Sequence, residues 1–221
     1  MTAGVDIVRS YRPADRSALR RVFGETADRG EPVENLMLDR EFAADLVTRY
    51  YTDFEPEMSW VAEIGGQVAG YLTGALDTRR YHRIMALRVV PLAVVRGVFR
   101  GMLFRAKTWR MLGAVPRNLR RYRERRRQSL ADYPAHLHVD ILAAHRGKGL
   151  GSELLQHFFE ALERRGIPGV HATVRGDNPA GRSFFERRGF RPVGQYAMAM
   201  MVEGSLRDVQ VLIYGKRLGS R

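Results

Sequence analysis

The apolar positions of the chain follow two spacings, one typical of strands and one typical of amphipathic helices. The clearest local signal is a pair of alternating arms around Gly65-Gly66-Gln67, where adjacent glycines supply the positive φ of a tight hairpin turn. The complete set of predicted elements is strand 5–9, a helix opening at Pro13 and broken at Gly30, a helix over 42–50 closing near Pro56, strands 60–64 and 68–72, strand 136–143, helix 150–165, strand 169–174, helix 179–188, and strands 190–202 and 209–216.

This order of elements predicts an α/β fold in which a mixed sheet carries helices on both faces. A chain of 221 residues is long enough for one well-buried domain. We therefore expect a single domain over residues 1–221, with a helical insertion at about residues 79–131 between the two halves of the pattern.

The most apolar stretch, residues 89–104, is interrupted by Pro91, Arg96 and Arg100. A membrane-spanning helix needs about 20 mostly uncharged residues, so this stretch does not fit one. The N-terminus has no apolar run typical of a signal peptide, and we expect a cytoplasmic protein. The absence of cysteine excludes disulfides, thiolate zinc sites and cysteine nucleophiles.

The net charge of +13 resides in one segment. Residues 79–127 contain 15 arginines and Lys107 against the single acid Glu124, so the segment carries +15 and the remainder −2. Apolar positions at helical spacing lie between the arginines, and Pro91 and Pro116 predict at least two helical pieces. Either this segment binds a polyanion, such as nucleic acid, an anionic membrane face or an acidic acceptor, or it is a solvated helical lid that packs on the domain or on a second subunit of a homodimer.

A glycine-rich turn, Arg146-Gly147-Lys148-Gly149-Leu150-Gly151, joins predicted strand 136–143 to predicted helix 150–165. The first N–H groups of a helix are unpaired and carry the positive end of the helix dipole, and glycines let a phosphate approach them. The pattern indicates a phosphate or pyrophosphate cradle. It is not a P-loop, because Gly149 follows Lys148, and it is not the dinucleotide fingerprint, because Ser152 replaces the third glycine.

The run Arg146-x-x-Gly149-x-Gly151 after a strand resembles the acetyl-coenzyme A loop of the GNAT N-acetyltransferase superfamily. A second stretch, Asn178-Pro179 through Phe184-Phe185 to Gly189-Phe190, is similar to that family's Asn, aromatic pair and Gly-Phe signature. The predicted element order matches the family over nearly the whole chain, apart from the insertion. The resemblance implies a GNAT-like fold and transfer of an acetyl group from acetyl-CoA to a small-molecule or protein amine, by direct attack in a ternary complex.

A narrower similarity involves Gly70-Tyr71-Leu72-Thr73-Gly74 and Tyr133-Pro134-Ala135-His136-Leu137-His138. These runs resemble the acetyltransferase-like domains of O-linked N-acetylglucosaminidases and their free-standing bacterial relatives. The family often has a tyrosine at the position of Phe185, whose hydroxyl can protonate the leaving thiolate. This departure keeps a second hypothesis open, an acetyl-CoA-binding module without transferase activity.

The resemblance also implies which residues hold the coenzyme. The backbone of predicted strand 136–143 pairs with the pantetheine arm, the loop amides bind the pyrophosphate, and Asn178 bonds the arm unless it is simply a helix cap. The implied coenzyme-binding residues are Ile141, Leu142, Ala143, Arg146, Gly147, Lys148, Gly149, Leu150, Gly151, Ser152, Asn178 and Phe185.

Acetylation of an amine needs a base, because an ammonium has no free electron pair. His136, His138 and Asp140 alternate along a predicted strand and so share one face. His138 suits proton transfer near neutral pH, Asp140 orients it or acts as base through a water, and Asp77 joins them if its strand is a neighbour. The alternative is that each is an ordinary hydrogen-bonded polar residue. We expect no metal, although His-x-His with Asp140 is a known zinc spacing, because the glycine loop needs none.

Overall fold

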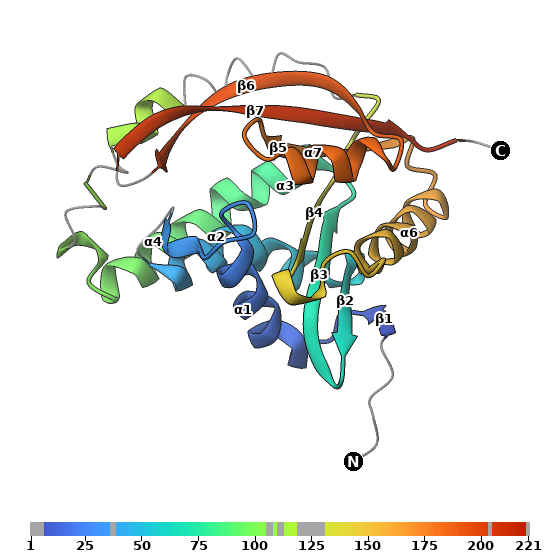
Figure 1. Cartoon of the computed structure of the whole chain (residues 1–221). Coiled ribbons are helices and arrows are strands. Elements are labelled where there is room, and N and C mark those ends of the chain that lie inside the picture. The colour runs from blue at the N-terminus through green and yellow to red at the C-terminus, as the bar shows by residue number, and fades with distance from the viewer. Residues whose placement is uncertain are drawn as a thin grey trace.

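The computed structural model describes residues 7–35, 39–104, 108–109, 113–118, 131–202 and 205–219. Within these residues the framework is a seven-stranded mixed sheet of order β1-β2-β3-β4-β5-β7-β6, with helices on both faces (Figure 1). The helices and strands are β1 (Ile7–Ser10), α1 (Arg16–Thr26), α2 (Arg40–Phe54), β2 (Ser59–Ile64), β3 (Gln67–Ala75), α3 (Thr78–Ile84), α4 (Val90–Phe99), β4 (Ala135–Ile141), α6 (Leu150–Glu163), β5 (Gly169–Arg175), α7 (Pro179–Glu186), β6 (Arg191–Val202) and β7 (Ser205–Arg217).

The element order confirms the predicted α/β fold with a mixed sheet. Gly65 and Gly66, at φ 57° and 81°, form the hairpin turn between β2 and β3. Most predicted bounds differ from the observed ones by a few residues, and two of the differences have a clear cause. The strand expected to reach residue 143 ends at Ile141, because residues 143–145 form a 3-10 turn, and the last strand begins at Ser205 because it pairs with β6 along a long hairpin.

Alternation along β4 divides its side chains between two cores. Leu137 and Val139 pack in the cluster that α6 covers with Leu154 and Phe158. His136, His138 and Asp140 point to the opposite face, where α1 and α2 lie, and this placement follows from the period of two along a strand. The core face of the strand is therefore apolar, and its polar side chains are concentrated on the other face.

β4 and β5 are parallel but pair over only two positions, Ala135 with Val170 and His136 with His171. On its other edge, β4 stays paired with β3 as far as Ile141. Within the described part of the chain, the edge of β4 that faces β5 has no partner strand beyond His136. We call this interval between the diverging strands, from His136 to the end of β4 where the glycine loop begins, the slot.

The predicted insertion starts as one helical run. Asp77 caps α3 by accepting hydrogen bonds from the N–H groups of Arg79 and Arg80 at 2.7 and 3.4 Å. A π-helical turn over residues 85–89 links α3 to α4, at the point where Pro91 has no N–H to donate to the preceding turn. Residues 113–118 are also helical, and the remaining predicted helical positions at 105–107, 110–112 and 119–130 lie outside the described residues. No helix in the described part of the chain has both the length and the apolar character to cross a bilayer.

Gly74 lets β3 approach α6 closely, because an added Cβ would overlap the ring of Phe158. We predict that Gly74→Ala lowers the free energy of unfolding by about 1–3 kcal/mol, since a packed core cannot absorb the extra methyl group. Urea denaturation measures this loss. Gly219→Ala, where no atom lies within 4 Å of the added Cβ, is the control and should leave stability unchanged. Equal unfolding midpoints for the two variants would contradict the close packing of α6 on β3.

Candidate active site

The three glycines of the loop after β4 serve two different purposes. Gly147 and Gly149 have φ of 77° and 86°, a region that favours glycine, and an added Cβ at either would meet no atom within 4 Å. Gly151 has ordinary backbone angles, but its Cβ would lie 2.8 Å from Cε2 of Phe184. The first two shape an open turn, and the third lets α7 pack against the start of α6.

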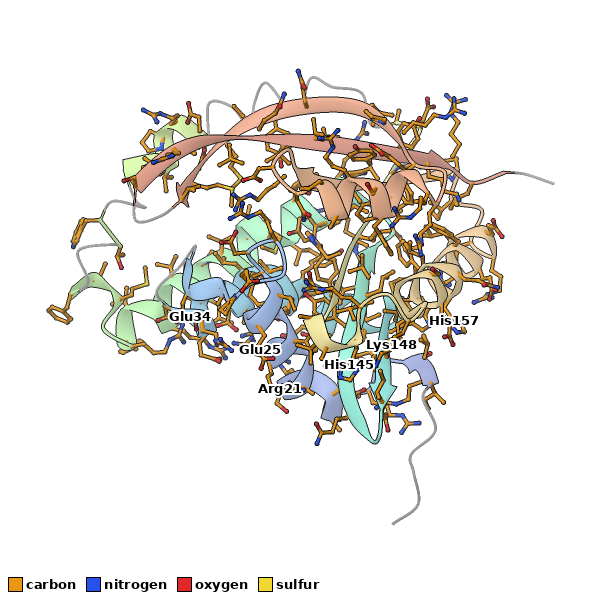
Figure 2. All side chains as sticks on the ribbon, in the orientation of Figure 1. Arg21, Glu25, Glu34, His145, Lys148 and His157 are labelled. Carbon is orange, nitrogen blue, oxygen red and sulfur yellow. The ribbon has the colours of Figure 1, made fainter. Side chains whose placement is uncertain are left out.

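This turn presents backbone donors that have no acceptor. Gly149 caps α6, and its carbonyl accepts from the N–H groups of Ser152 and Glu153 at 2.8 and 3.2 Å. The N–H groups of residues 147–151 meet no acceptor in the described part of the chain. Lys148 extends from the same turn at the molecular surface (Figure 2). Free amides, a helix N-terminus and a lysine form a donor set that fits a pyrophosphate.

Arg146 holds the loop in place. Its Nε donates to the carbonyl of Ile141 at 2.9 Å, and one terminal nitrogen donates to the carbonyl of Gly30 at 3.2 Å. Gly30 lies in the connection between α1 and α2, and the side chain of Arg146 leaves no room there for a Cβ. The arginine of the predicted motif thus fastens the loop to a distant turn of the chain.

The same connection is tied to the end of β5. Arg175 donates to Asp28 at 2.7 Å and also to Asp177, while Arg29 reaches Asp177 at 3.3 Å. The turn at residues 28–31 therefore bridges the ends of both strands that border the slot. No sequence motif indicated this turn, because its contacts lie more than a hundred residues away.

Asn178 is the N-cap of α7, and its Oδ1 accepts from the N–H of Gly181 at 2.9 Å. Asn178 therefore does act as a helix cap, which was the alternative to a coenzyme contact. Its Nδ2 group has no acceptor among the described residues. Of the aromatic pair, Phe185 is buried against the rings of Phe190 and Tyr214, whereas Phe184 contacts Gly151. Phe185, which we expected at the coenzyme, thus packs in the core, and its neighbour Phe184 lies at the glycine loop.

The remaining predicted coenzyme residues flank the loop. Leu142 packs against the core under α1, and its N–H bonds to the carbonyl of Ala69 at 2.9 Å. Ala143 is exposed in the 3-10 turn rather than in the strand, and Leu150 is buried. The hydroxyl of Ser152 bonds to Arg188, whose guanidinium lies 4.1 Å from the ring centre of Phe184.

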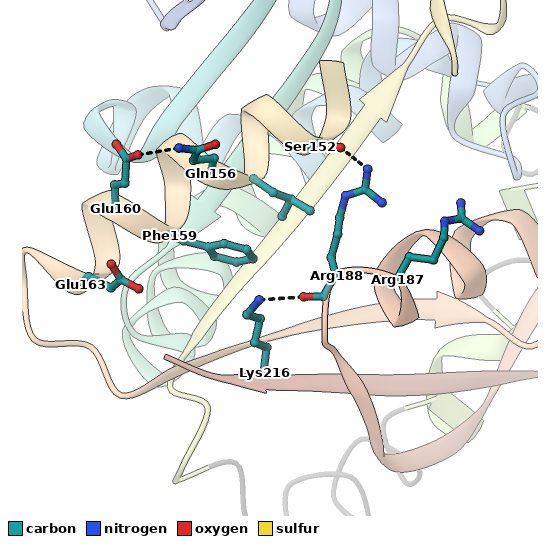
Figure 3. Close-up of a pocket in the computed structure, with 9 residues that line it drawn as sticks. Ser152, Gln156, Phe159, Glu160, Glu163, Arg187, Arg188 and Lys216 are labelled. Carbon is teal, nitrogen blue, oxygen red and sulfur yellow. Dashed lines mark hydrogen bonds between the residues drawn. The ribbon is translucent and has the colours of Figure 1, made fainter. Parts of the chain in front are cut away.

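A hollow of about 720 Å³ is lined by α6 and borders the loop at Ser152. Figure 3 shows the residues that line it. Glu160 and Glu163 line it together with Arg187, Arg188 and Lys216. Because both signs of charge face this hollow, its lining favours neither anions nor cations strongly. The polar cluster of β4 lies on the other face of the sheet.

Asp140 lies opposite Tyr71 in the register of β3 and β4, and the Tyr71 hydroxyl donates to its carboxylate at 2.6 Å. Burial raises the pKa of Asp140 to about 6, although hydrogen bonds from Tyr71 and Thr26 and the charge of Arg146 act in the opposite direction. A carboxyl group with this pKa gains and releases a proton close to neutral pH, as a general base must.

Three histidines surround the last paired position of β4 and β5. His136 is buried, with Nε2 at 2.9 Å from the Tyr51 hydroxyl and Nδ1 at 2.8 Å from the Thr78 hydroxyl. Thr78 donates its own hydrogen to the carbonyl of Pro134, so neutral His136 carries its proton on Nδ1 and accepts from Tyr51 at Nε2. The rings of His138 and His171 lie 6.2 and 5.6 Å from that of His136.

Asp77 does not lie near Asp140. Its carboxylate is engaged as the exposed cap of α3. It lies beyond the end of β3 and six residues after Tyr71, the partner of Asp140, which is about 20 Å at strand spacing. Both ring nitrogens of His136 have partners, and no group of three or more potential metal ligands occurs among the described residues. His138 and Asp140 are thus the predicted catalytic residues that the structure brings to one side of the slot.

A family model for the acetyltransferase (GNAT) family matches residues 123–190. Among solved structures, SsHAT is 28% identical in sequence to this chain and superposes with a TM-score of 0.73. The match covers 98% of this chain and 100% of that chain. A ribosomal-protein-alanine N-acetyltransferase from Brucella melitensis is 20% identical (96% and 99% covered, TM-score 0.57). The structure of yncA from Salmonella typhimurium with its cofactor acetyl-CoA is 15% identical (99% and 96% covered, TM-score 0.58).

The chain thus shares its fold with solved N-acetyltransferase structures such as that from Brucella melitensis. Within this fold two parallel strands separate, and the glycine loop lies at the open end. The match to the GNAT acetyltransferase family model covers that loop together with β4, α6, β5 and α7, so this part of the chain is similar to that family.

We predict that Gly149→Ala weakens acetyl-CoA binding at least about tenfold, because a side chain at φ 86° costs about 1–2 kcal/mol and moves the amides of the loop. Isothermal titration calorimetry measures the affinity. Gly166→Ala is the matched control, since Gly166 also has positive φ and open space but follows α6 at its far end. An equal loss of affinity in both variants would contradict a local role for the loop.

We also predict that Asp140→Asn stabilises the protein above pH 7 by about 1–3 kcal/mol. The raised pKa of Asp140 means that its ionised form is disfavoured in the fold, so its contribution to stability is greatest below about pH 4 and is lost as pH rises through about 6. Thermal unfolding of the wild type and the variant at several pH values tests the sign. A stability difference that does not depend on pH would contradict the raised pKa.

Proposed function

We propose that this protein acetylates an amine acceptor, with Asp140 as the general base and with the slot between β4 and β5 as the coenzyme site. The observation that carries the proposal is that β4 and β5 separate after His136 and His171, with the glycine loop at the open end. An extended amide-bearing arm can pair with the free strand edge only where no strand already occupies it.

The residues that would hold the coenzyme follow from this slot. The edge of β4 up to Ile141 offers backbone groups to the pantetheine arm, and the amides of residues 147–151 offer donors to the pyrophosphate. Asn178 supplies Nδ2, since Oδ1 is used by the cap of α7. Acetyl-CoA supplies an activated acetyl thioester, and the chain's own residues supply position and proton transfer.

The acceptor enters on the face of β4 that carries His138 and Asp140. Its nitrogen forms a bond to the acetyl carbon, the carbon–sulfur bond breaks, and the sulfur keeps the bonding electrons as a thiolate. Asp140 takes the proton that the nitrogen loses, directly or through a water, and Tyr71 orients the carboxylate through its hydrogen bond. A thiol has a pKa of about 8.5, so the thiolate is a tolerable leaving group without an acid at Phe185.

His138 is the second proton-carrying candidate on the same face. Its ring lies edge-on to Tyr51 at 5.7 Å, at the closed end of the slot. Asp140 is favoured as base because its carboxyl has a raised pKa and a fixed orientation. The roles of the two residues are separable by mutation.

We predict that kcat/KM for an amine falls as pH decreases through about 6, because a protonated Asp140 cannot accept a proton. Asp140→Asn should lower kcat/KM about 10²–10⁴-fold and remove this limb of the profile. Release of coenzyme A thiol from acetyl-CoA, measured with a panel of small amines and amine-bearing peptides, follows the reaction.

Asp132→Asn is the control, since Asp132 is an exposed carboxylate paired with Arg217, and its rates should equal those of the wild type. If His138→Ala removes the limb and Asp140→Asn does not, the base is His138. If acetyl-CoA raises the melting temperature and yet no acceptor in the panel releases thiol, the binding-module hypothesis replaces the enzyme.

A further inference from the structure

α4 exposes apolar side chains where a soluble helix normally exposes polar ones. Its line of contact with the rest of the protein is marked by Ala93 and Gly97, which are buried four residues apart. The outward positions Leu92, Val95 and Phe99 form a stripe at helical spacing, and Val94 and Val98 widen it. An outward face of this composition needs a partner other than water.

The exposure is large at the bulky side chains. Phe99 is 88% exposed and Val95 50%, while Leu87 and Phe104 at either end of the helix are 71% and 93% exposed. Large apolar side chains gathered on one surface mark a contact with a protein or a membrane. We call the exposed apolar side chains within residues 87–104 the apolar ridge.

The charge around this apolar ridge has one sign. Residues 78–104 contain six arginines and no acid. Arg80, Arg96 and Arg100 reach Glu55, Asp45 and Asp39 on the inner side. Arg79, Arg83 and Arg88 are exposed and have no carboxylate partner among the described residues, so the rim of the ridge is cationic.

The helical run that leads into α4 is anchored at its start, in α3. The ring of Tyr81 in α3 lies 4.7 Å from that of Tyr50 and 4.5 Å from that of His136. Thr78 hydrogen-bonds both His136 and the carbonyl of Pro134. The apolar ridge is therefore a surface fixed to the sheet next to the histidine cluster.

We propose that the apolar ridge docks the protein on an anionic lipid surface. An amphipathic helix with exposed phenylalanine and leucine and with flanking arginines lies in the boundary between headgroups and acyl chains. Two copies of the ridge facing each other would bring cations together in an apolar contact, which disfavours a dimer through this face. Nucleic acid offers no apolar surface to match phenylalanines that are not arranged to stack on bases.

The test is sedimentation of the full-length protein with vesicles. Binding to phosphatidylcholine vesicles containing about 30% phosphatidylglycerol should be at least about tenfold tighter than to phosphatidylcholine alone, and it should weaken as NaCl rises from about 0.1 M to about 0.5 M. The paired substitution Val95→Ser with Phe99→Ser should lower the affinity for the anionic vesicles about tenfold or more. Arg83→Gln with Arg88→Gln should remove most of the preference for anionic lipid.

Matched control variants distinguish binding through the apolar ridge from nonspecific binding through other exposed apolar or cationic side chains. Val193→Ser with Met198→Ser removes two apolar side chains, each 38% exposed, from β6, and Arg164→Gln with Arg191→Gln removes two charges elsewhere. Both controls should bind like the wild type. The proposal is overturned if the two vesicle types bind equally, or if controls and test variants lose affinity alike.

Two further outcomes overturn it in favour of another occupant. A dimer in sedimentation velocity that dissociates on Val95→Ser with Phe99→Ser would assign the apolar ridge to a second copy of the chain. If duplex DNA binds more tightly than anionic vesicles, and Val95→Ser with Phe99→Ser does not change this affinity, the arginines of this surface bind nucleic acid rather than lipid.

Discussion

The separation of β4 from β5 is the constraint on which the rest of the structure depends. Parallel strands normally satisfy each other's backbone groups along their length, and here they do so only at Ala135–Val170 and His136–His171. The interruption creates a free strand edge in the middle of the sheet. The sheet remains continuous because β4 pairs with β3 on one side and β5 pairs with β7 on the other. α6 packs over the apolar core on one face of the sheet.

An open slot in a sheet needs cross-links at its mouth. The turn at residues 28–31 provides them, since Arg146 reaches Gly30 from the end of β4 and Arg175 reaches Asp28 from the end of β5. These two bonds, of which the first is exposed and the second partly buried, link the ends of both strands to the same turn. Arg146 also acts on Asp140, because its positive charge lowers the pKa of a carboxyl group whose pKa burial raises. The residue that fixes the loop thus also affects the ionisation of the carboxyl group.

The insertion is attached to the same site through a different set of contacts. Asp77, the residue where β3 gives way to α3, serves as a cap, and Thr78 and Tyr81 then engage His136. The proposed membrane-facing ridge of α4 therefore begins within one helical run of the histidine cluster. A surface that orients α4 also orients the face of β4 that carries His138 and Asp140.

The sequence by itself determined the element order, the hairpin at Gly65-Gly66 and the likeness of the loop region to the GNAT family, because periodicity, paired glycines and the spacing of the loop motif are local properties. It also located the excess charge in residues 79–127. Only the tertiary structure decided that Tyr71 meets Asp140, that Asp77 does not, and that Phe184 rather than Phe185 lies at the loop. Those outcomes depend on strand register and on the rotation of a helix against its neighbours, which contacts far apart in the chain set.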